Sequence, residues 1–269
     1  MTNRCGVLGK PIAHSLSPVM HRAAYAQLGL DWTYDAYEVT ESELEGFLAG
    51  CDESWRGLSL TMPLKRAIIG LADEVTSVAG ALGVANTVEF RDGKRVASNT
   101  DSAGALAALV ERGVRNTKTA RILGGGATAT SVAYALATNG VGHIEFVVRN
   151  PDTAADAVAV AEKAGAETVV RLIDRPLIDV VDLLVSTVPA KVVSMKAHDL
   201  VDSTHAVFDV IYDPWPSPLA LAAKESGLKF VSGLDLLAHQ AAFQVELMTG
   251  SPIEAHILRD AALAELAAR

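Results

Sequence analysis

The stretch LSLTMPLKRAII, residues 58–69, places a hydroxyl and an ammonium group on either side of a proline in an apolar run. Thr61 stands two residues before Pro63, and Lys65 stands two residues after it. Proline is favoured at the first position of a helix, so Pro63 predicts a helix whose first turn contains Lys65. The positive end of a helix dipole disfavours an ammonium ion, which suits a lysine that exchanges a proton during catalysis. Taken alone, Lys65 fits equally well a solvated surface side chain, which is what most lysines are.

A glycine turn suggests a second kind of chemistry. The segment ILGGGATA follows a strand pattern, precedes a helical pattern and reads Gly124-x-Gly126-x-x-Ala129. In dinucleotide-binding folds the first glycine allows the tight turn, the second lets the backbone approach a pyrophosphate, and the small third residue packs helix against strand. The following helix then offers free N–H groups to the phosphates. The motif together with its strand–helix context predicts a dinucleotide site.

Arg149 refines the choice of dinucleotide. It ends the next predicted strand, HIEFVVRN, where a site that prefers NAD usually has an acidic residue for the ribose hydroxyl. Glu145 lies too early in that strand to take this role. A guanidinium group suits the 2′-phosphate of NADP through paired hydrogen bonds, so the sequence favours NADP over NAD. The alternative interpretation is a solvated arginine at the end of a strand.

Composition narrows the function classes. The 269 residues are 50% hydrophobic and 20% charged, which supports a sizeable core and argues against disorder. A net charge of -9 argues against nucleic acid as a partner. The only two cysteines, Cys5 and Cys51, fit a reducing compartment, and we see neither a secretory signal nor a run long enough to span a membrane. The seven histidines show no metal-ligand spacing, so we expect no metal in a cytoplasmic protein.

The order of the predicted elements indicates an α/β fold. Short β-branched runs alternate with alanine-rich helical segments, which predicts mostly parallel sheets with right-handed crossovers. Asp92-Gly93 predicts the turn of a hairpin, Ser17 is expected to cap a helix that begins at Pro18, and Asp101 lies where another helix begins. The pattern changes near residue 102 and returns near residue 235. We therefore expect one domain made of residues 1–101 and 235–269, and a second, inserted domain made of residues 102–234.

Six short motifs resemble those of the shikimate dehydrogenase family, in order and over essentially the whole chain. They are HSLSP (14–18), LTMPLK (60–65), GVANT (83–87), SNTD (98–101), DVIYDP (209–214) and GLDLLAHQ (233–240). The resemblance implies an N-terminal α/β substrate domain, completed by the last helices, and a Rossmann-type NADP domain. It also implies reversible reduction of 3-dehydroshikimate to shikimate with NADPH, a step of aromatic amino acid biosynthesis, by a monomer or homodimer.

The resemblance assigns roles to individual residues. Lys65 and Asp101 match the proton-transfer dyad, and the carboxylate would hold the lysine side chain in place. The positions matching substrate-binding residues, besides that pair, are Ser15, Ser17, Thr61, Asn86, Tyr212 and Gln240. The positions matching cofactor-binding residues are Gly124, Gly125, Gly126, Ala127, Thr128, Ala129, Arg149, Asn150, Thr187, Val188 and Gly233. Without the family pattern, Asp101 and Ser17 are explained as helix caps and Asn86 as a turn residue.

Some positions depart from the family pattern and leave alternatives open. Ser59 stands where the family often has asparagine, which weakens a supporting hydrogen bond. Thr153 stands where a second basic residue is common, so use of NAD beside NADP remains open. A quinate or dual quinate/shikimate dehydrogenase is the nearest alternative, and a non-catalytic, substrate-sensing relative is a more distant one. An enzyme like methylenetetrahydrofolate dehydrogenase would share the architecture without carrying these motifs.

Overall fold

The computed structural model describes residues 2–175 and 179–269, which form two compact units. The first unit comprises Met1–Thr100 with Leu237–Arg269, and the second comprises Asp101–Leu236. The predicted breaks lay after residues 101 and 234, within two residues of these. In the described part of the chain, no helix is both long and apolar enough to cross a membrane.

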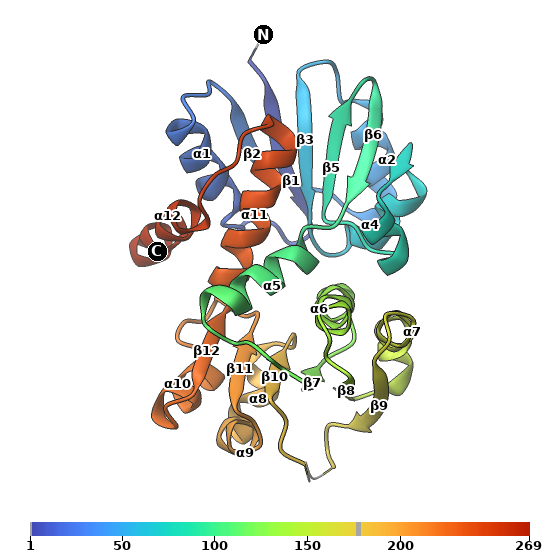
Figure 1. Ribbon diagram of the computed structural model, residues 1–269. Helices are drawn as coiled ribbons and strands as arrows, with labels where there is room; N and C mark the ends of the chain where they lie inside the picture. The colour runs from blue at the N-terminus through green and yellow to red at the C-terminus, as the bar shows by residue number, and fades with distance from the viewer. Residues whose placement is uncertain (1, 176–178) are drawn as a thin grey trace. The chain divides into compact units, whose positions relative to one another are not determined.

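The first unit is built on a mixed sheet of six strands (Figure 1). Three of its strand pairs are parallel, and the pairs β3–β5 and β5–β6 are antiparallel. In spatial order the strands are β2 (Thr33–Glu38), β1 (Arg4–Gly9), β3 (Trp55–Leu60), β5 (Thr87–Arg91), β6 (Lys94–Ser98) and β4 (Glu74–Val75).

The hairpin that joins β5 to β6 shows how closely local sequence fixes local structure. Arg91 pairs with Lys94, which leaves a two-residue turn at Asp92 and Gly93. Both turn residues have positive φ, 52° and 75°, as a type I′ turn requires. The predicted Asp-Gly turn is therefore confirmed.

Helices cover both faces of this sheet. Leu44, Leu48, Leu64, Ile68 and Ala79 pack against one face. They belong to α2 (Glu41–Ala49), α3 (Leu64–Ala67), the 3₁₀ turn Ile68–Gly70 and α4 (Ser77–Leu82). The other face carries α1 (Ser17–Gln27) and α11 (Gly233–Thr249), while α12 (Ala255–Ala268) packs beside α1.

The second unit contains a fully parallel six-stranded sheet. Its order is β12 (Lys229–Ser232), β11 (Ala206–Asp209), β10 (Leu183–Ser186), β7 (Thr119–Leu123), β8 (His143–Val148) and β9 (Glu167–Leu172). Counted from β7, this is the 6-5-4-1-2-3 order of a Rossmann sheet, with its switch point between β7 and β10. The predicted Rossmann-type fold is confirmed, and ligands of such sheets bind at the carboxyl ends of the strands near the switch point.

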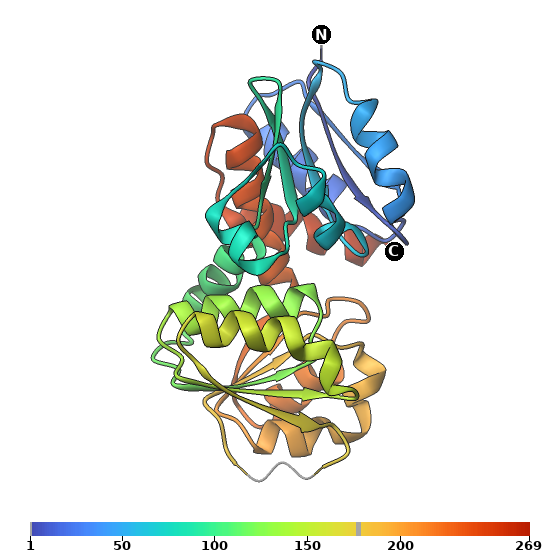
Figure 2. The ribbon, with the colours of Figure 1, turned by 90° about the vertical axis from the view of Figure 1, so that its right-hand side faces the viewer.

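Two helical layers enclose this sheet. Figure 2 shows α6 (Ala127–Thr138) and α7 (Ala155–Lys163) side by side over one face, which α5 (Asp101–Glu111) also covers. The predicted helix from Pro151 begins as the 3₁₀ turn Pro151–Ala154 before α7. The other face carries α8 (Ala190–Val193), the 3₁₀ turn Ser194–Lys196, α9 (Ala197–Asp202) and α10 (Pro218–Glu225).

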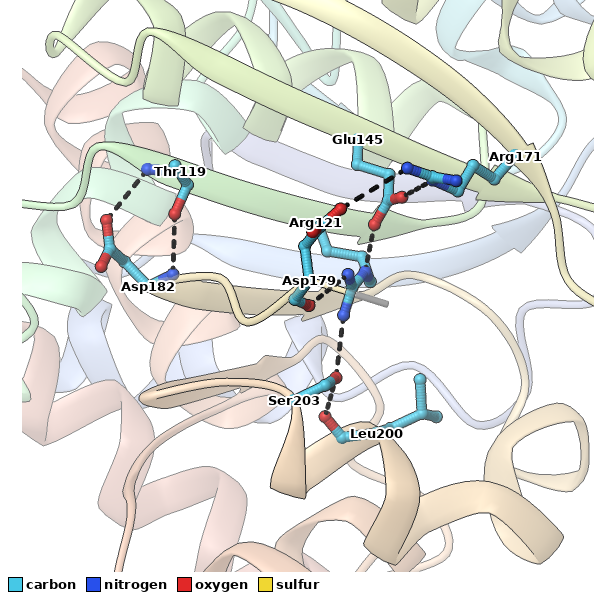
Figure 3. Close-up of polar contacts among 8 residues, drawn as sticks. All are labelled: Thr119, Arg121, Glu145, Arg171, Asp179, Asp182, Leu200 and Ser203. Carbon is cyan, nitrogen blue, oxygen red and sulfur yellow. Dashed lines mark hydrogen bonds and ion pairs between the residues drawn. The ribbon is translucent and has the colours of Figure 1, made fainter. Parts of the chain in front are cut away.

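A cluster of charges with a buried centre links β7, β8 and β9 of the second sheet (Figure 3). Arg121 of β7 is 0% exposed, and its Nε donates to the Glu145 carboxylate on β8. Its two terminal nitrogens donate to Ser203 Oγ at 2.8 Å and to the Asp179 carbonyl at 2.9 Å. Arg171 of β9 also pairs with Glu145. Glu145 thus balances arginines from both neighbouring strands, consistent with its being too early in the strand to serve a ribose.

Candidate active site

Most of the predicted substrate-binding residues of the first unit lie at one edge of its sheet. The parallel strands β1 and β3 end at Gly9 and Leu60, and the segments that follow them carry Ser15 and Ser17, and Thr61 and Lys65. Strand β5 runs antiparallel to β3, with Ser59 opposite Thr87, so its start, after Asn86, lies at that same edge. The topology therefore gathers three separate motifs.

Asn86 and Gln240 are brought into direct contact, although 154 residues separate them. The Asn86 side-chain amide donates to Gln240 Oε1 at 3.0 Å and to Thr100 Oγ1 at 2.9 Å, and its oxygen accepts the Thr100 backbone N–H at 2.8 Å. Asn86 is 1% exposed and Gln240 6%. Asn86 is thus a fixed member of a buried amide cluster, and it also lies in the bend that precedes β5.

A backbone hydrogen bond to the segment before Asn86 places Lys65 in its short helix. The helix α3 begins at Leu64, one residue later than predicted, because Pro63 (φ −94°, ψ 7°) forms the cap. Lys65 is therefore the second helical residue and still belongs to the first turn. Its carbonyl accepts the Ala85 N–H at 2.9 Å, which places the segment leading to Asn86 beside Lys65.

Ser17 does not cap α1 as predicted. The backbone of Leu16 (φ −88°, ψ −8°) is already in the helical region, so the helix begins at Ser17 and Leu16 is the cap residue. The backbone N–H of Ser17 instead donates to Ser15 Oγ at 3.3 Å. The two serines of the S-x-S motif are therefore adjacent, and Ser17 is nearly buried at 6% exposure.

Asp101 is the first residue of α5 and is 5% exposed. The helix begins one residue earlier than the capping alternative required, so Asp101 belongs to the helix and does not precede it. Lys65 belongs to the first unit and Asp101 opens the second. Their action as a dyad remains a prediction.

Tyr212 lies in a turn that a buried carboxyl group holds. Asp209, at the end of β11, accepts the Ser217 hydroxyl at 2.6 Å and the Ile211 N–H at 3.3 Å. Burial raises the pKa of Asp209, and the hydrogen bonds from Ser217 and Ile211 oppose that shift. Gly233 lies beside this turn, where a Cβ atom would collide with the Val210 carbonyl. Only a glycine lets α11 begin this close to the turn.

The glycine turn lines a cavity of about 440 Å³ at the carboxyl ends of β7, β8 and β10. Seven predicted cofactor residues contribute to its wall: Gly124, Gly125, Gly126, Arg149, Asn150, Thr187 and Val188. Ala127, Thr128 and Ala129 form the first turn of α6 behind it. Gly233 is not part of this wall. The wall also contains Ile173 and Val192, which sequence reasoning missed because no residue type marks their positions.

The backbone of this turn fits a dinucleotide cradle. Gly124 has φ +107°, and a Cβ there would collide with Thr187 Oγ1. A Cβ on Gly125 would come within 2.6 Å of Ala154 Cα, whereas the space beside Gly126, the cap residue of α6, is open. The turn therefore packs closely against the protein on one side and leaves bare backbone toward the cavity, as a pyrophosphate group requires.

Arg149 and Asn150 stand at the exposed rim of the cavity. Asn150 Oδ1 accepts the Asp152 N–H at 3.1 Å and so caps the 3₁₀ turn before α7. Thr153 also lines the cavity, and its hydroxyl donates to the Asn150 carbonyl at 2.6 Å. Arg149 thus brings a guanidinium group to the rim of this cavity.

Comparison with known proteins decides the family. The curated shikimate dehydrogenase (NADP(+)) of Methanopyrus kandleri is 37% identical, over 98% of this chain and 96% of its own length. The chain belongs to the shikimate dehydrogenase family. A model of the shikimate dehydrogenase substrate binding domain matches residues 7–88 of this member.

Solved structures of other shikimate dehydrogenases agree. The Mycobacterium tuberculosis enzyme superposes with a TM-score of 0.88 at 41% identity, covering 97% of this chain and 99% of its own. The Thermus thermophilus enzyme, solved with NADP(H) and shikimate, gives a TM-score of 0.84 at 32% identity over 98% and 99% of the two chains. The predicted family resemblance is confirmed over nearly the full length of this shikimate dehydrogenase family member.

Proposed function

We propose that this chain catalyses the reversible, NADP-dependent reduction of 3-dehydroshikimate to shikimate in aromatic amino acid biosynthesis. The observation that carries the proposal is the contact of Asn86 with Gln240 at the sheet edge that also carries Thr61 and Lys65. It occurs in a chain that matches shikimate dehydrogenases over almost its entire length. The low cysteine count supports the cytoplasm as the place of the reaction.

The first unit would bind the substrate through short polar side chains. Ser15 and Ser17, two positions apart, offer hydroxyls that can donate to the substrate carboxylate. Thr61, Asn86 and Gln240 offer hydroxyl and amide groups for the ring hydroxyls of shikimate. Asp101 and Tyr212, from the second unit, are the remaining proposed contacts. Because Asn86 and Gln240 are buried and hydrogen-bonded before substrate arrives, little side-chain ordering would oppose binding.

The second unit would bind NADP in the cavity beside the glycine turn. Bound NADPH supplies a hydride to the carbonyl carbon of 3-dehydroshikimate. The backbone of residues 124–126 would face the pyrophosphate, and Arg149 would bind the 2′-phosphate. Thr153 brings no second charge, so Arg149 alone carries the proposed preference for NADP among the predicted cofactor residues.

Lys65 and Asp101 would handle the proton that accompanies the hydride. The Lys65 ammonium donates a proton to the former carbonyl oxygen of the substrate, which becomes the new hydroxyl of shikimate. In the opposite direction the neutral Lys65 amine accepts that proton. The Asp101 carboxylate would hold the lysine side chain in position.

Initial rates with four pairs of substrate and cofactor test this proposal. Shikimate or quinate is supplied with NADP⁺ or NAD⁺, and reduction of the cofactor is followed by absorbance. Turnover with shikimate and NADP⁺ well above the other three pairs is the expected result. Faster turnover with quinate or NAD⁺ would move the protein to the quinate branch, and lack of turnover with all four pairs would favour a non-catalytic relative.

A further inference from the structure

Ser59 departs from the usual family pattern, and its side chain is part of a buried polar cluster in the first unit. It lies on β3 and is 4% exposed. The Tyr34 hydroxyl, from β2 of the same sheet, donates to Ser59 Oγ at 2.6 Å. Ser59 in turn donates to Gln244 Oε1 at 2.7 Å. Tyr34 is 0% exposed and Gln244 1%, so these are hydrogen bonds of the protein interior.

Gln244 connects Ser59 to residues of the proposed substrate site. Its Nε2 donates to the Asn86 carbonyl at 3.1 Å and to Thr87 Oγ1 at 3.0 Å. The Thr87 hydroxyl then donates to Asn86 Oδ1 at 3.0 Å. Asn86 itself donates to Gln240 Oε1, as described above. Ser59 and Gln244, which are 185 positions apart, are therefore directly bonded within one connected set of hydrogen bonds.

The donors in this set all point in the same direction. Each hydroxyl or amide from Tyr34 to Gln240 accepts from the group before it and donates to the group after it. Hydrogen bonds arranged in this way polarise and strengthen one another. The direction also determines which end of the Asn86 amide is the donor, because Thr87 and the Thr100 N–H both occupy Oδ1. The Nδ2 end of Asn86 is consequently held toward Gln240 and Thr100.

The chain of hydrogen bonds also reaches the serine end of the site. Burial raises the pKa of Tyr34, and hydrogen bonds with Ser59 and with Ser17 oppose that shift. Ser17 is one of the two serines proposed for the substrate carboxylate. Tyr34 therefore lies between the group proposed for the carboxylate and the groups proposed for the ring hydroxyls.

We propose that Tyr34, Ser59 and Gln244 are positioning residues that orient the Asn86 amide for the ring hydroxyls of the substrate. This inference rests on the proposed function. Gln244 connects Ser59 to Asn86, because it accepts from the Ser59 hydroxyl and donates to the Asn86 carbonyl. In this chain, recognition of the substrate hydroxyls depends on residues that do not touch the substrate.

The Michaelis constant for shikimate tests the proposal. Ser59→Ala and Gln244→Leu each break the chain between Tyr34 and Thr87, and each is expected to raise KM for shikimate about tenfold, the equivalent of one or two hydrogen bonds. The dissociation constant of NADPH, measured by fluorescence, should stay within twofold of the wild type. Tyr34→Phe removes only the first donor and keeps the ring, so a rise of about threefold is expected from this mildest variant.

Tyr25→Phe is the matched control. Tyr25 is a buried tyrosine that packs in the same hydrophobic cluster as Tyr34, and its hydroxyl is not part of the chain of hydrogen bonds. It should leave KM for shikimate unchanged. A double-mutant cycle with Asn86→Ala distinguishes a purely structural role of these hydrogen bonds from a role exerted through Asn86. If Ser59 acts through Asn86, Ser59→Ala should raise KM less than twofold further in the Asn86→Ala protein.

Four results would overturn the inference. An unchanged KM in Ser59→Ala and Gln244→Leu would show that the chain does not influence substrate binding. A tenfold rise in KM caused by Ser59→Ala in the Asn86→Ala protein would show that Ser59 does not act through Asn86. If the wild-type protein does not turn over shikimate, the proposed function is wrong and the inference falls with it. If Ser59→Ala does not fold, Tyr34→Phe decides, and an unchanged KM in that variant overturns the proposal.

Discussion

Lys65 carries the chemistry proposed at the scale of single residues. Replacing it with alanine removes the proton donor while α3 keeps its cap at Pro63. We expect Lys65→Ala to lower kcat at least 100-fold, the usual contribution of a positioned acid–base group. The Kd for NADPH should change less than twofold. The exposed lysine of the hairpin, Lys94, provides the control, because Lys94→Ala should leave both constants unchanged. Turnover near the wild-type rate in Lys65→Ala would remove Lys65 from the mechanism.

Arg149 determines the proposed choice between cofactors. Arg149→Asp replaces a cation at the rim of the cavity with an anion that would repel a 2′-phosphate. We expect KM for NADP⁺ to rise at least tenfold while KM for NAD⁺ changes little, and initial rates with each cofactor measure both. Arg115→Asp, in the exposed segment before β7, makes the same charge change away from this cavity. If both arginine variants raise KM equally, the effect comes from net charge and the assignment of Arg149 is wrong.

His21 makes the stability of the first unit depend on pH. It is 0% exposed, and its Nδ1 lies 3.0 Å from the Ser17 carbonyl. Burial lowers its pKa to about 4, against about 6.5 in an unfolded chain, while the bond with Ser17 opposes that shift. As pH falls below about 6.5, the unfolded chain takes up a proton that the folded chain refuses. The free energy of unfolding should therefore fall between pH 6.5 and pH 4, by up to about 3 kcal/mol.

Denaturant unfolding at pH 7.5 and at pH 5 measures this loss. His21→Phe should show a smaller drop between the two pH values than the wild type. The control is His256→Asn in α12, where the side chain is exposed, and it should keep the wild-type drop. Identical drops in the His21→Phe protein and the wild type would show that another group causes the acid sensitivity.

At the scale of elements, the second sheet depends on a buried charge balance. Glu145→Gln would leave Arg121, which is 0% exposed, and Arg171 without their shared carboxylate (Figure 3). Removing one partner of a buried ion pair typically costs about 3–5 kcal/mol, so a large drop in Tm is expected from calorimetry. Glu167→Gln, on the exposed side of β9, should change stability by less than about 0.5 kcal/mol. A Tm loss no greater than that of Glu167→Gln would contradict this.

Local signals predicted the elements better than they predicted the site. The Asp92-Gly93 turn and the glycine turn at Gly124 could be identified because each needs a residue type that fits its own φ. The cap predicted at Ser17 was wrong, since the backbone at Leu16 already follows the helix and no residue type announces that. The role of Ser59 could not be predicted, because its partner Gln244 lies 185 positions away. Sequence indicated that Ser59 was unusual, and only the fold shows what it contacts.

At the scale of the whole molecule, the proposal assigns substrate to the first unit and NADP to the second. A ligand stabilises the regions it contacts and so slows exchange of their backbone amides with deuterium. Shikimate is expected to protect residues 15–17, 61–65 and 86–87, and NADP⁺ to protect residues 124–130, 147–153 and 187–192. Hydrogen-exchange mass spectrometry of the wild-type protein with each ligand alone measures this directly. Quinate and NAD⁺ serve as matched ligands that should protect the same regions less. If shikimate slows exchange only within 101–236, the assignment of substrate to the sheet edge of the first unit is wrong, and the contact of Asn86 with Gln240 has a purely structural role.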